Sequence, residues 1–106
     1  MKRSLGLIFL FLFLAFAEAP AQRVNRTKDL PYVPESSPNF DQKRHRLDVY
    51  RPQKTSETSP VVVFLHGGTW MFQSKNWYKH VGKELAKQGF VGIVPNYRLA
   101  PEHSYD

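Results

Sequence analysis

A run of five apolar residues is the feature that most limits how this chain can fold. Residues 61–65 read Val-Val-Val-Phe-Leu, with no polar residue among them. A strand with one face in water alternates apolar and polar side chains, so this run predicts a strand buried on both faces, as in the centre of a parallel sheet. Parallel strands need a crossover connection, usually a helix, which directs attention to the residues that follow.

A helix and a second apolar run follow at the spacing that such a crossover requires. Residues 77–88 predict an amphipathic helix with one buried stripe, because apolar side chains recur every four positions, at Trp77, Val81 and Leu85, with Ala86 alongside. Gly89 is placed to end this helix in the left-handed conformation. Residues 90–94 form the second apolar run. Strand, helix and strand in this order predict an α/β fold with a parallel central sheet and flanking helices.

The residues before this unit predict one more strand and a leader. Residues 44–50 alternate, with Leu47 and Val49 on one side, which is typical of a half-buried strand near a sheet edge. Residues 53–59 are short and polar and predict a hairpin-type loop. Residues 22–43 are polar and punctuated by proline, so we expect an extended leader or loop rather than a regular element.

The first 21 residues predict a signal peptide. Lys2 and Arg3 precede an apolar run over residues 5–17, which is short for a helix that crosses a bilayer. Small residues then stand at the spacing that a signal peptidase reads, and we expect cleavage after Ala21 or after Ala17. The expected product is secreted and has no stable membrane span after signal removal. A signal-anchored membrane protein is the alternative.

One glycosylation sequon follows the predicted signal. Asn25-Arg26-Thr27 is the only Asn-x-Ser/Thr triplet in the sequence, and we expect Asn25 to be exposed near the mature N-terminus. The sequence contains no cysteine, so no disulfide framework can hold the exported protein together. Its core therefore depends on packing alone.

The loop after the buried strand is the best candidate for a functional site. Loops at the carboxyl ends of parallel strands border the crevice where ligands bind in open α/β sheets, and this one reads His66-Gly67-Gly68-Thr69-Trp70. Adjacent glycines let a backbone turn sharply and present N–H groups. Such donors can stabilise the oxyanion that develops on an attacked carbonyl. Ordinary turns also use glycine, so the pair alone leaves that interpretation open. We expect His66 to brace the loop through hydrogen bonds.

Four motifs in order resemble the α/β-hydrolase superfamily, in its esterase and lipase branch. They are residues 47–52 (Leu-Asp-Val-Tyr-Arg-Pro), the run 61–65, the loop 66–70 and residues 96–102 (Asn-Tyr-Arg-Leu-Ala-Pro-Glu). The sequence is similar to the hormone-sensitive-lipase-like carboxylesterases and to the bifunctional feruloyl and acetyl-xylan esterase-like group. The resemblance implies that residues 44–106 form a partial domain, the N-terminal part of an incomplete α/β-hydrolase fold.

The resemblance also assigns roles to the loop. It implies a serine nucleophile in a G-x-S-x-G elbow, followed by an acid and a histidine. It implies that Gly67, Gly68 and Thr69 form the oxyanion-hole loop, with the backbone N–H groups of the last two as the expected donors. Trp70 is expected either to wall the acyl pocket or to belong to the core. Many relatives carry a third glycine in place of Thr69, and often a glycine in place of Gln73.

The nucleophile that the resemblance implies is missing. No G-x-S-x-G occurs in the 106 residues, and Ser74 and Ser104 lack the flanking glycines. His80 and His103 have no plausible serine partner. We therefore expect the chain to be the N-terminal portion of a secreted serine carboxylic-ester hydrolase, inactive by itself, whose full-length form acts on a small ester. The alternatives are a non-catalytic secreted interaction protein derived from a hydrolase, and a fragment of an arylformamidase-like amidohydrolase.

Charge and composition indicate no other class of ligand. The formal net charge is +6, but its densest group, Lys43, Arg44 and Arg46, lacks the aromatic residues that mark a nucleic-acid surface. No second ligand stands at a metal-site spacing from His66, and no glycine-rich phosphate-binding motif is present. We expect no metal, no cofactor and no nucleic-acid partner.

Overall fold

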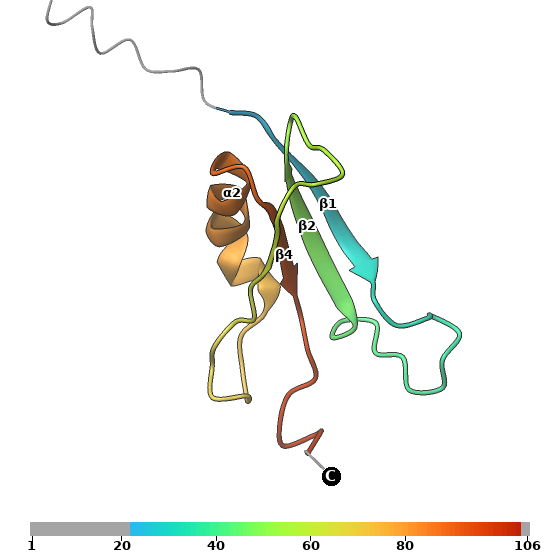
Figure 1. The fold of residues 1–106 in the computed structure, drawn as a ribbon. Coiled ribbons are helices and arrows are strands. Elements are labelled where there is room, and N and C mark those ends of the chain that lie inside the picture. The colour runs from blue at the N-terminus through green and yellow to red at the C-terminus, as the bar shows by residue number, and fades with distance from the viewer. Residues whose placement is uncertain (1–21, 105–106) are drawn as a thin grey trace, which may run out of the picture.

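Four strands and one main helix make up the described part of the chain. The computed structural model describes residues 22–104, so the predicted signal peptide lies outside the described residues. Figure 1 shows the sheet with the helix packed against one face. The elements, in order, are β1 (Val24–Pro31), β2 (Arg46–Pro52), β3 (Val61–Val63), the short 3₁₀ helix η1 (Lys75–Tyr78), α2 (Lys79–Lys87) and β4 (Val91–Pro95). Neither helix of residues 22–104 is long and apolar enough to cross a membrane.

The strand order confirms an α/β fold with a mixed sheet. The order is β1-β2-β4-β3, in which β1 pairs antiparallel with β2 and β2 pairs antiparallel with β4. β3 pairs parallel with β4, and α2 makes the crossover between them, as the apolar runs predict. Because β4 lies between β2 and β3, the loop over residues 53–59 does not close a hairpin. That expectation was wrong, since a short polar loop does not reveal which strands are neighbours.

β1 corrects the expectation that residues 22–43 form no regular element. Residues 24–31 form a strand, paired with β2 from Val24 opposite Pro52 to Pro31 opposite Arg46, with a register shift between Thr27 and Leu30. Its side chains are largely exposed, so no hydrophobic alternation marks it in the sequence. The strand is held by its backbone ladder and by the ion pair from Arg26 to β2.

The helix forms where it is predicted, and Ala86 of the expected stripe is buried, but Trp77 is not. Gly89 ends it with φ +92, as expected. Trp77, expected in the stripe, is 72% exposed, and Gly82 and Ala86 are the buried residues of α2. The smallest side chains face the sheet because the helix lies very close to it. A Cβ at Gly82 would stand 2.2 Å from the Tyr50 ring.

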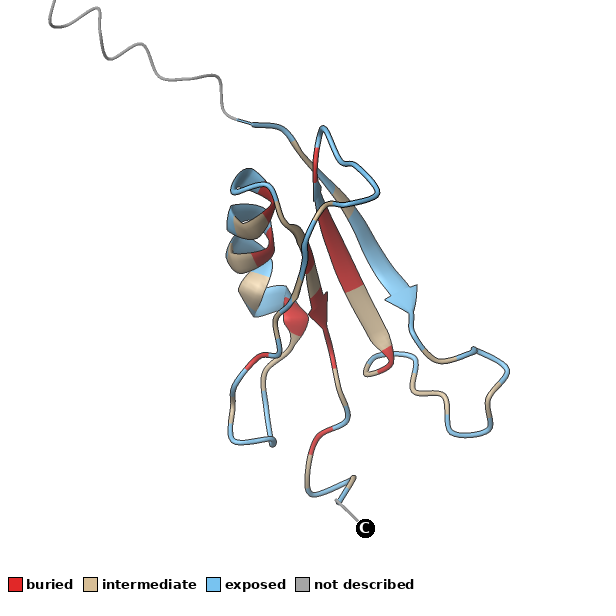
Figure 2. Cartoon of the chain, in the orientation of Figure 1, coloured by how far each residue is buried: buried red, intermediate tan, exposed pale blue. Residues whose placement is uncertain are grey.

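The two faces of the sheet differ in what covers them. Tyr50 and Val94 pack with Ala86 of α2 in the core, joined by partly buried Phe64 and Tyr78. Figure 2 shows this buried layer between α2 and the neighbouring strands. On the opposite face Val61, Val63 and Leu65 are 57%, 57% and 65% exposed. Burial of the run 61–65 on both faces is therefore not seen within residues 22–104, whose other elements cover one face only.

The contact between Gly82 and Tyr50 yields the first prediction. Helix propensity alone predicts that Gly82→Ala stabilises the protein by about 1 kcal/mol. The clash with Tyr50 should reverse the sign, because forcing extra volume into a packed core costs about 1–3 kcal/mol. We expect a lower midpoint of urea unfolding, followed by circular dichroism, and a nearly unchanged midpoint for Lys83→Ala at an exposed position of α2. A higher midpoint for Gly82→Ala would show that the helix can move away from the sheet.

Candidate functional site

The candidate loop begins where β3 ends and lies beside the chain that leaves β4. Phe64 continues the parallel pairing, since its N–H donates to Ile93 O at 2.8 Å. Beyond the loop tip, Ala100 N donates to Trp70 O at 2.7 Å and ties the loop to the segment after β4. Both segments leave the same end of the sheet, as Figure 1 shows. This is the carboxyl end of the parallel pair, where the sequence predicts the site.

Every carbonyl at the start of the loop is held by a donor. The Tyr97 hydroxyl donates to His66 O, and the His66 ring donates from Nδ1 to Gly67 O at 2.7 Å. Gly68 O accepts three hydrogen bonds, from Thr69 Oγ1 at 2.8 Å and from the two amides that follow in the turn, Met71 N at 3.1 Å and Phe72 N at 3.3 Å. The three successive peptide planes are therefore fixed in direction.

The amides of those planes are free. In a trans peptide the N–H points away from the preceding C=O, so fixing the carbonyls of residues 66–68 turns the N–H groups of Gly67, Gly68 and Thr69 the other way. None of the hydrogen bonds formed among residues 22–104 uses these three N–H groups. Gly67 and Thr69 are exposed and Gly68 is half-buried. Three successive backbone donors are thus left without a partner in the described part of the chain.

The loop keeps this shape through left-handed backbone conformations. Gly68 has φ +116, and Thr69, Trp70 and Gln73 have φ of 52, 58 and 81. Such conformations cost a residue with a side chain about 1–3 kcal/mol each. Thr69 and Gln73 are the two positions where the resemblance implies glycine in relatives. Both departures from glycine therefore fall at positions whose backbone has a left-handed φ.

His66 braces the loop from within, as expected. Its ring is 2% exposed and lies stacked between Tyr97, at 4.4 Å between centroids, and Tyr78, at 5.9 Å. Because the Gly67 carbonyl can only accept, Nδ1 must carry a proton and donate it in this hydrogen bond. Nε2 is buried and has no partner within the described residues.

Trp70 does not belong to the core of the described residues. It is 74% exposed and lines a pocket of about 510 Å³ with Arg98, Ala100, His103 and Ser104. The pocket lies between the loop tip and the segment after β4, which the Ala100–Trp70 hydrogen bond joins. No hydrogen bond links a serine hydroxyl to a histidine ring anywhere in residues 22–104, and His80 is exposed on α2.

A buried ionic network supports the loop from the far side. Asp48 is fully buried, and its carboxylate accepts hydrogen bonds from Arg26 Nη2 at 2.6 Å, Lys75 Nζ at 2.8 Å and Asp29 N at 3.0 Å. Lys75 Nζ also pairs with Asp29 at 2.6 Å. Burial by itself raises the pKa of Asp48, but the hydrogen bonds from Lys75 and Arg26 outweigh it and hold the pKa below its ordinary value.

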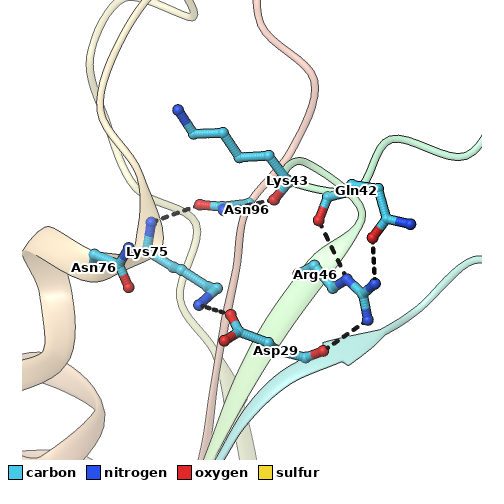
Figure 3. A pocket seen from close by; sticks show the side chains of 7 residues that line it. All are labelled: Asp29, Gln42, Lys43, Arg46, Lys75, Asn76 and Asn96. Atoms are coloured by element: carbon cyan, nitrogen blue, oxygen red, sulfur yellow. Dashed lines mark hydrogen bonds and ion pairs between the residues drawn. The ribbon is translucent and has the colours of Figure 1, made fainter.

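The backbone of Lys75 carries this support to the loop. Its N–H donates to Asn96 Oδ1 at 2.7 Å, and Asn96 Nδ2 donates to Lys43 O at 2.9 Å (Figure 3). Arg44 Nη1 donates to Gln73 O at 3.0 Å. The downstream end of the loop is thus fixed to the end of β4 and to the segment before β2. Sequence reasoning did not find Lys75, and Asp48 was noticed only as part of a motif.

The residues that line the pocket drawn in Figure 3 are bonded mainly to one another, so the pocket offers few free polar groups to a ligand. It measures about 440 Å³, and most of its polar groups are already paired. Arg46 donates to Gln42 O, Gln42 Oε1, Asp29 O and Glu35, while Lys75 is held by two carboxylates. No group of three His, Cys, Asp or Glu residues in the described part of the chain could hold a metal ion.

Comparison with known proteins places these features in context. Residues 47–106 match the BD-FAE family. The chain is 36% identical over 74 residues to the probable isoprenylcysteine alpha-carbonyl methylesterase ICMEL1 of Arabidopsis thaliana, covering 70% of this chain and 16% of that protein. It is 39% identical over 61 residues to kynurenine formamidase of Salmo salar, covering 58% of this chain and 21% of that protein.

Solved structures show the same fold. Esterase B from Lactobacillus rhamnosis superposes with a TM-score of 0.62 at 23% sequence identity, over 95% of this chain and 31% of that chain. The chain spans less than a third of the length of each of these three proteins.

Gly68 and Gly67 form a matched pair for testing the loop. A Cβ at Gly68 would stand 2.3 Å from Phe72 O, and its φ of +116 disfavours any side chain, whereas a Cβ at Gly67 meets nothing within 4 Å. We expect Gly68→Ala to speed hydrogen exchange at the Met71 and Phe72 amides about tenfold or more, because the turn onto Gly68 O opens. Gly67→Ala should leave both rates nearly unchanged. Equal effects of the two substitutions would contradict the loop geometry.

Asp48→Asn tests the buried network through its pH dependence. Removing the charge leaves Lys75 and Arg26 without their buried partner, which should cost about 3–5 kcal/mol at pH 7. Since folding lowers the pKa of Asp48, its stabilising effect is present above the unfolded pKa of about 4 and is lost as the pH falls through the lower folded value. The stability gap between native protein and variant, measured by urea unfolding, should therefore narrow below about pH 4.

Glu57→Gln, on the exposed loop before β3, is the control and should change stability little at either pH. A gap between native protein and Asp48→Asn that stays constant from pH 7 to pH 3 would show that the charge of Asp48 is not what stabilises the fold.

Proposed function

The chain belongs to the BD-FAE family, in the esterase branch of the α/β-hydrolase superfamily, and we propose that it is the N-terminal part of a secreted serine carboxylic-ester hydrolase. The observation that carries the proposal is the row of three free amides after β3, whose preceding carbonyls are all held by donors.

The proposed chemistry is acyl transfer. When a serine hydroxyl attacks an ester carbonyl, the carbonyl oxygen becomes an oxyanion, and the same charge returns when water attacks the acyl-enzyme. The N–H groups of Gly68 and Thr69 are the proposed donors for this oxygen in both steps. Their preorganisation matters because donors fixed in advance need not reorient during the reaction, and each such donor contributes about 3–4 kcal/mol to the stability of the transition state.

The nucleophile, acid and histidine are proposed to lie in sequence beyond these 106 residues. No G-x-S-x-G is present in these residues, and the chain aligns with less than a third of the length of each of these relatives. An oxyanion hole without a nucleophile has nothing to form the acyl-enzyme, so the chain by itself is proposed to be inactive. Trp70 is proposed to wall the acyl side of the site, because its exposed ring follows directly after the donors.

Amide hydrolysis is the second candidate reaction. The relative from Salmo salar is named a kynurenine formamidase, and its identity over the matched residues, 39%, is no lower than that of the plant methylesterase. Attack on an amide carbonyl develops the same oxyanion, so the loop geometry suits either bond. The preference for an ester or an amide then depends on the groups that bind and protonate the leaving alcohol or amine.

Two measurements test the proposal. Sequencing the transcript past the codon for Asp106 should reveal a G-x-S-x-G followed by an acid and a histidine. A stop codon directly after Asp106 would favour a non-catalytic secreted interaction protein instead. In the longer product, the ratio of kcat/KM for p-nitrophenyl acetate to that for an aryl formamide should exceed one. The reverse ratio would favour the amidohydrolase.

The 106-residue chain gives the complementary result. It should hydrolyse p-nitrophenyl acetate no faster than buffer and should not be labelled by a serine-directed fluorophosphonate, because it has no activated serine. Labelling of Ser74 or Ser104, together with turnover that the label abolishes, would contradict the proposed inactivity. The variants Ser74→Ala and Ser104→Ala would identify the serine responsible.

A further inference from the structure

The sequon Asn25-Arg26-Thr27 lies on β1, the strand that sequence reasoning did not predict. We propose that Asn25 carries an N-linked oligosaccharide that projects from the sheet and shields its β1 edge. The inference does not depend on the esterase assignment. It depends on export of the chain, which the experiment below separates from the choice of acceptor.

The three residues of the sequon divide between the two faces of the sheet. Successive side chains of a strand point to opposite faces. Arg26 is half-buried and points toward the α2 side, with its guanidinium 2.6 Å from Asp48 and 5.4 Å from the centroid of the Tyr50 ring. Asn25 and Thr27 are both exposed and point the other way. An oligosaccharide on Asn25 therefore leaves the ion pair of Arg26 intact.

The acceptor side chain is free to react. No hydrogen bond among residues 22–104 uses the carboxamide of Asn25 or the hydroxyl of Thr27. In the transfer, Asn25 Nδ2 forms a bond to the anomeric carbon of the oligosaccharide and loses one proton. The polyprenyl diphosphate of the lipid-linked donor leaves with the electron pair of the broken bond. Such a modification is bulky and requires an exposed side chain, and Asn25 is exposed.

The position of β1 gives the oligosaccharide a physical role. β1 is an outer strand of the sheet, and its free edge pairs with no strand in the described part of the chain. An unpaired edge can add strands from other molecules. The register shift between Thr27 and Leu30 and the charge of Lys28 already interrupt the second half of this edge. The first half, around Asn25, pairs with β2 without a register shift and its one charged side chain, Arg26, is paired with Asp48, so the oligosaccharide would stand where the edge is most regular.

Expression in a eukaryotic secretory host tests the acceptor. One version keeps residues 1–21, and a second replaces them with an established signal peptide. We expect a single step in gel mobility on treatment with peptide N-glycosidase F. The step should vanish in Asn25→Gln and in Thr27→Ala, and should persist in Thr27→Ser and Arg26→Lys, which keep a sequon.

Each outcome decides a separate point. No mobility step in the version with the replaced signal peptide overturns the acceptor assignment. A step in that version alone supports Asn25 as the acceptor and overturns export by the chain's own N-terminus. Neither result bears on the oxyanion loop, whose test is the downstream G-x-S-x-G.

The shielding role has its own measurement. Sedimentation of the folded glycoprotein before and after enzymatic removal of the oligosaccharide should show more self-association after removal. The same treatment of Asn25→Gln should change nothing. Equal association of the glycosylated and deglycosylated protein would overturn the shielding role while leaving the acceptor in place.

Discussion

The carboxylate of Asp48 is the group on which the arrangement of the described chain depends. It lies fully buried on β2 and receives hydrogen bonds from β1, through Arg26 and the Asp29 amide, and from η1, through Lys75. Burying such a charge costs several kcal/mol, which its partners must offset. Because β1 and η1 both bond to this one carboxylate, moving either element would leave a buried charge without part of its compensation. The exposed side chains of β1 contribute little burial, so this contact and the backbone ladder with β2 together hold the strand in place.

The ionic network around Asp48 is connected to the candidate loop by the backbone of Lys75, not by a direct side-chain contact. Lys75 follows the loop directly, and its amide is fixed by Asn96, which in turn is fixed to the segment before β2. At the other end of the loop, Tyr97 holds the carbonyl of His66. Asn96 and Tyr97 are neighbours at the end of β4, so one short segment fixes both ends of the loop. A residue that never touches a ligand can thus determine where the free amides point.

The sequence allowed prediction of the features that depend on local pattern. The run 61–65, the helix and the terminating Gly89 each follow from residues close together, and the fold class follows from their order. β1 could not be predicted, because its side chains are largely exposed and show no hydrophobic alternation, and because its support comes from the ladder with β2 and from an ion pair to a residue 22 positions away. Trp77 was misplaced because periodicity marks an apolar stripe but does not reveal that α2 approaches Tyr50 closely enough to require Gly82 and Ala86 at the contact. The sequence places residues 66–70 directly after the apolar run, at the carboxyl end of the parallel pair, but which amides of this loop lack a partner depends on contacts that only the folded chain displays.

Backbone strain in the loop explains why so many hydrogen bonds are needed to hold it. Thr69, Trp70 and Gln73 adopt left-handed conformations that together cost several kcal/mol, at about 1–3 kcal/mol each. A free loop would relax from them, and relaxation would turn the peptide planes. Three donors on Gly68 O, the buried ring of His66 on Gly67 O and the fixed backbone of Lys75 oppose that relaxation. Glycine at positions 69 and 73 would lower the strain, but it would also widen the range of conformations that the loop can adopt. The side chains at these positions therefore lower the stability of the loop but narrow the range of conformations open to it.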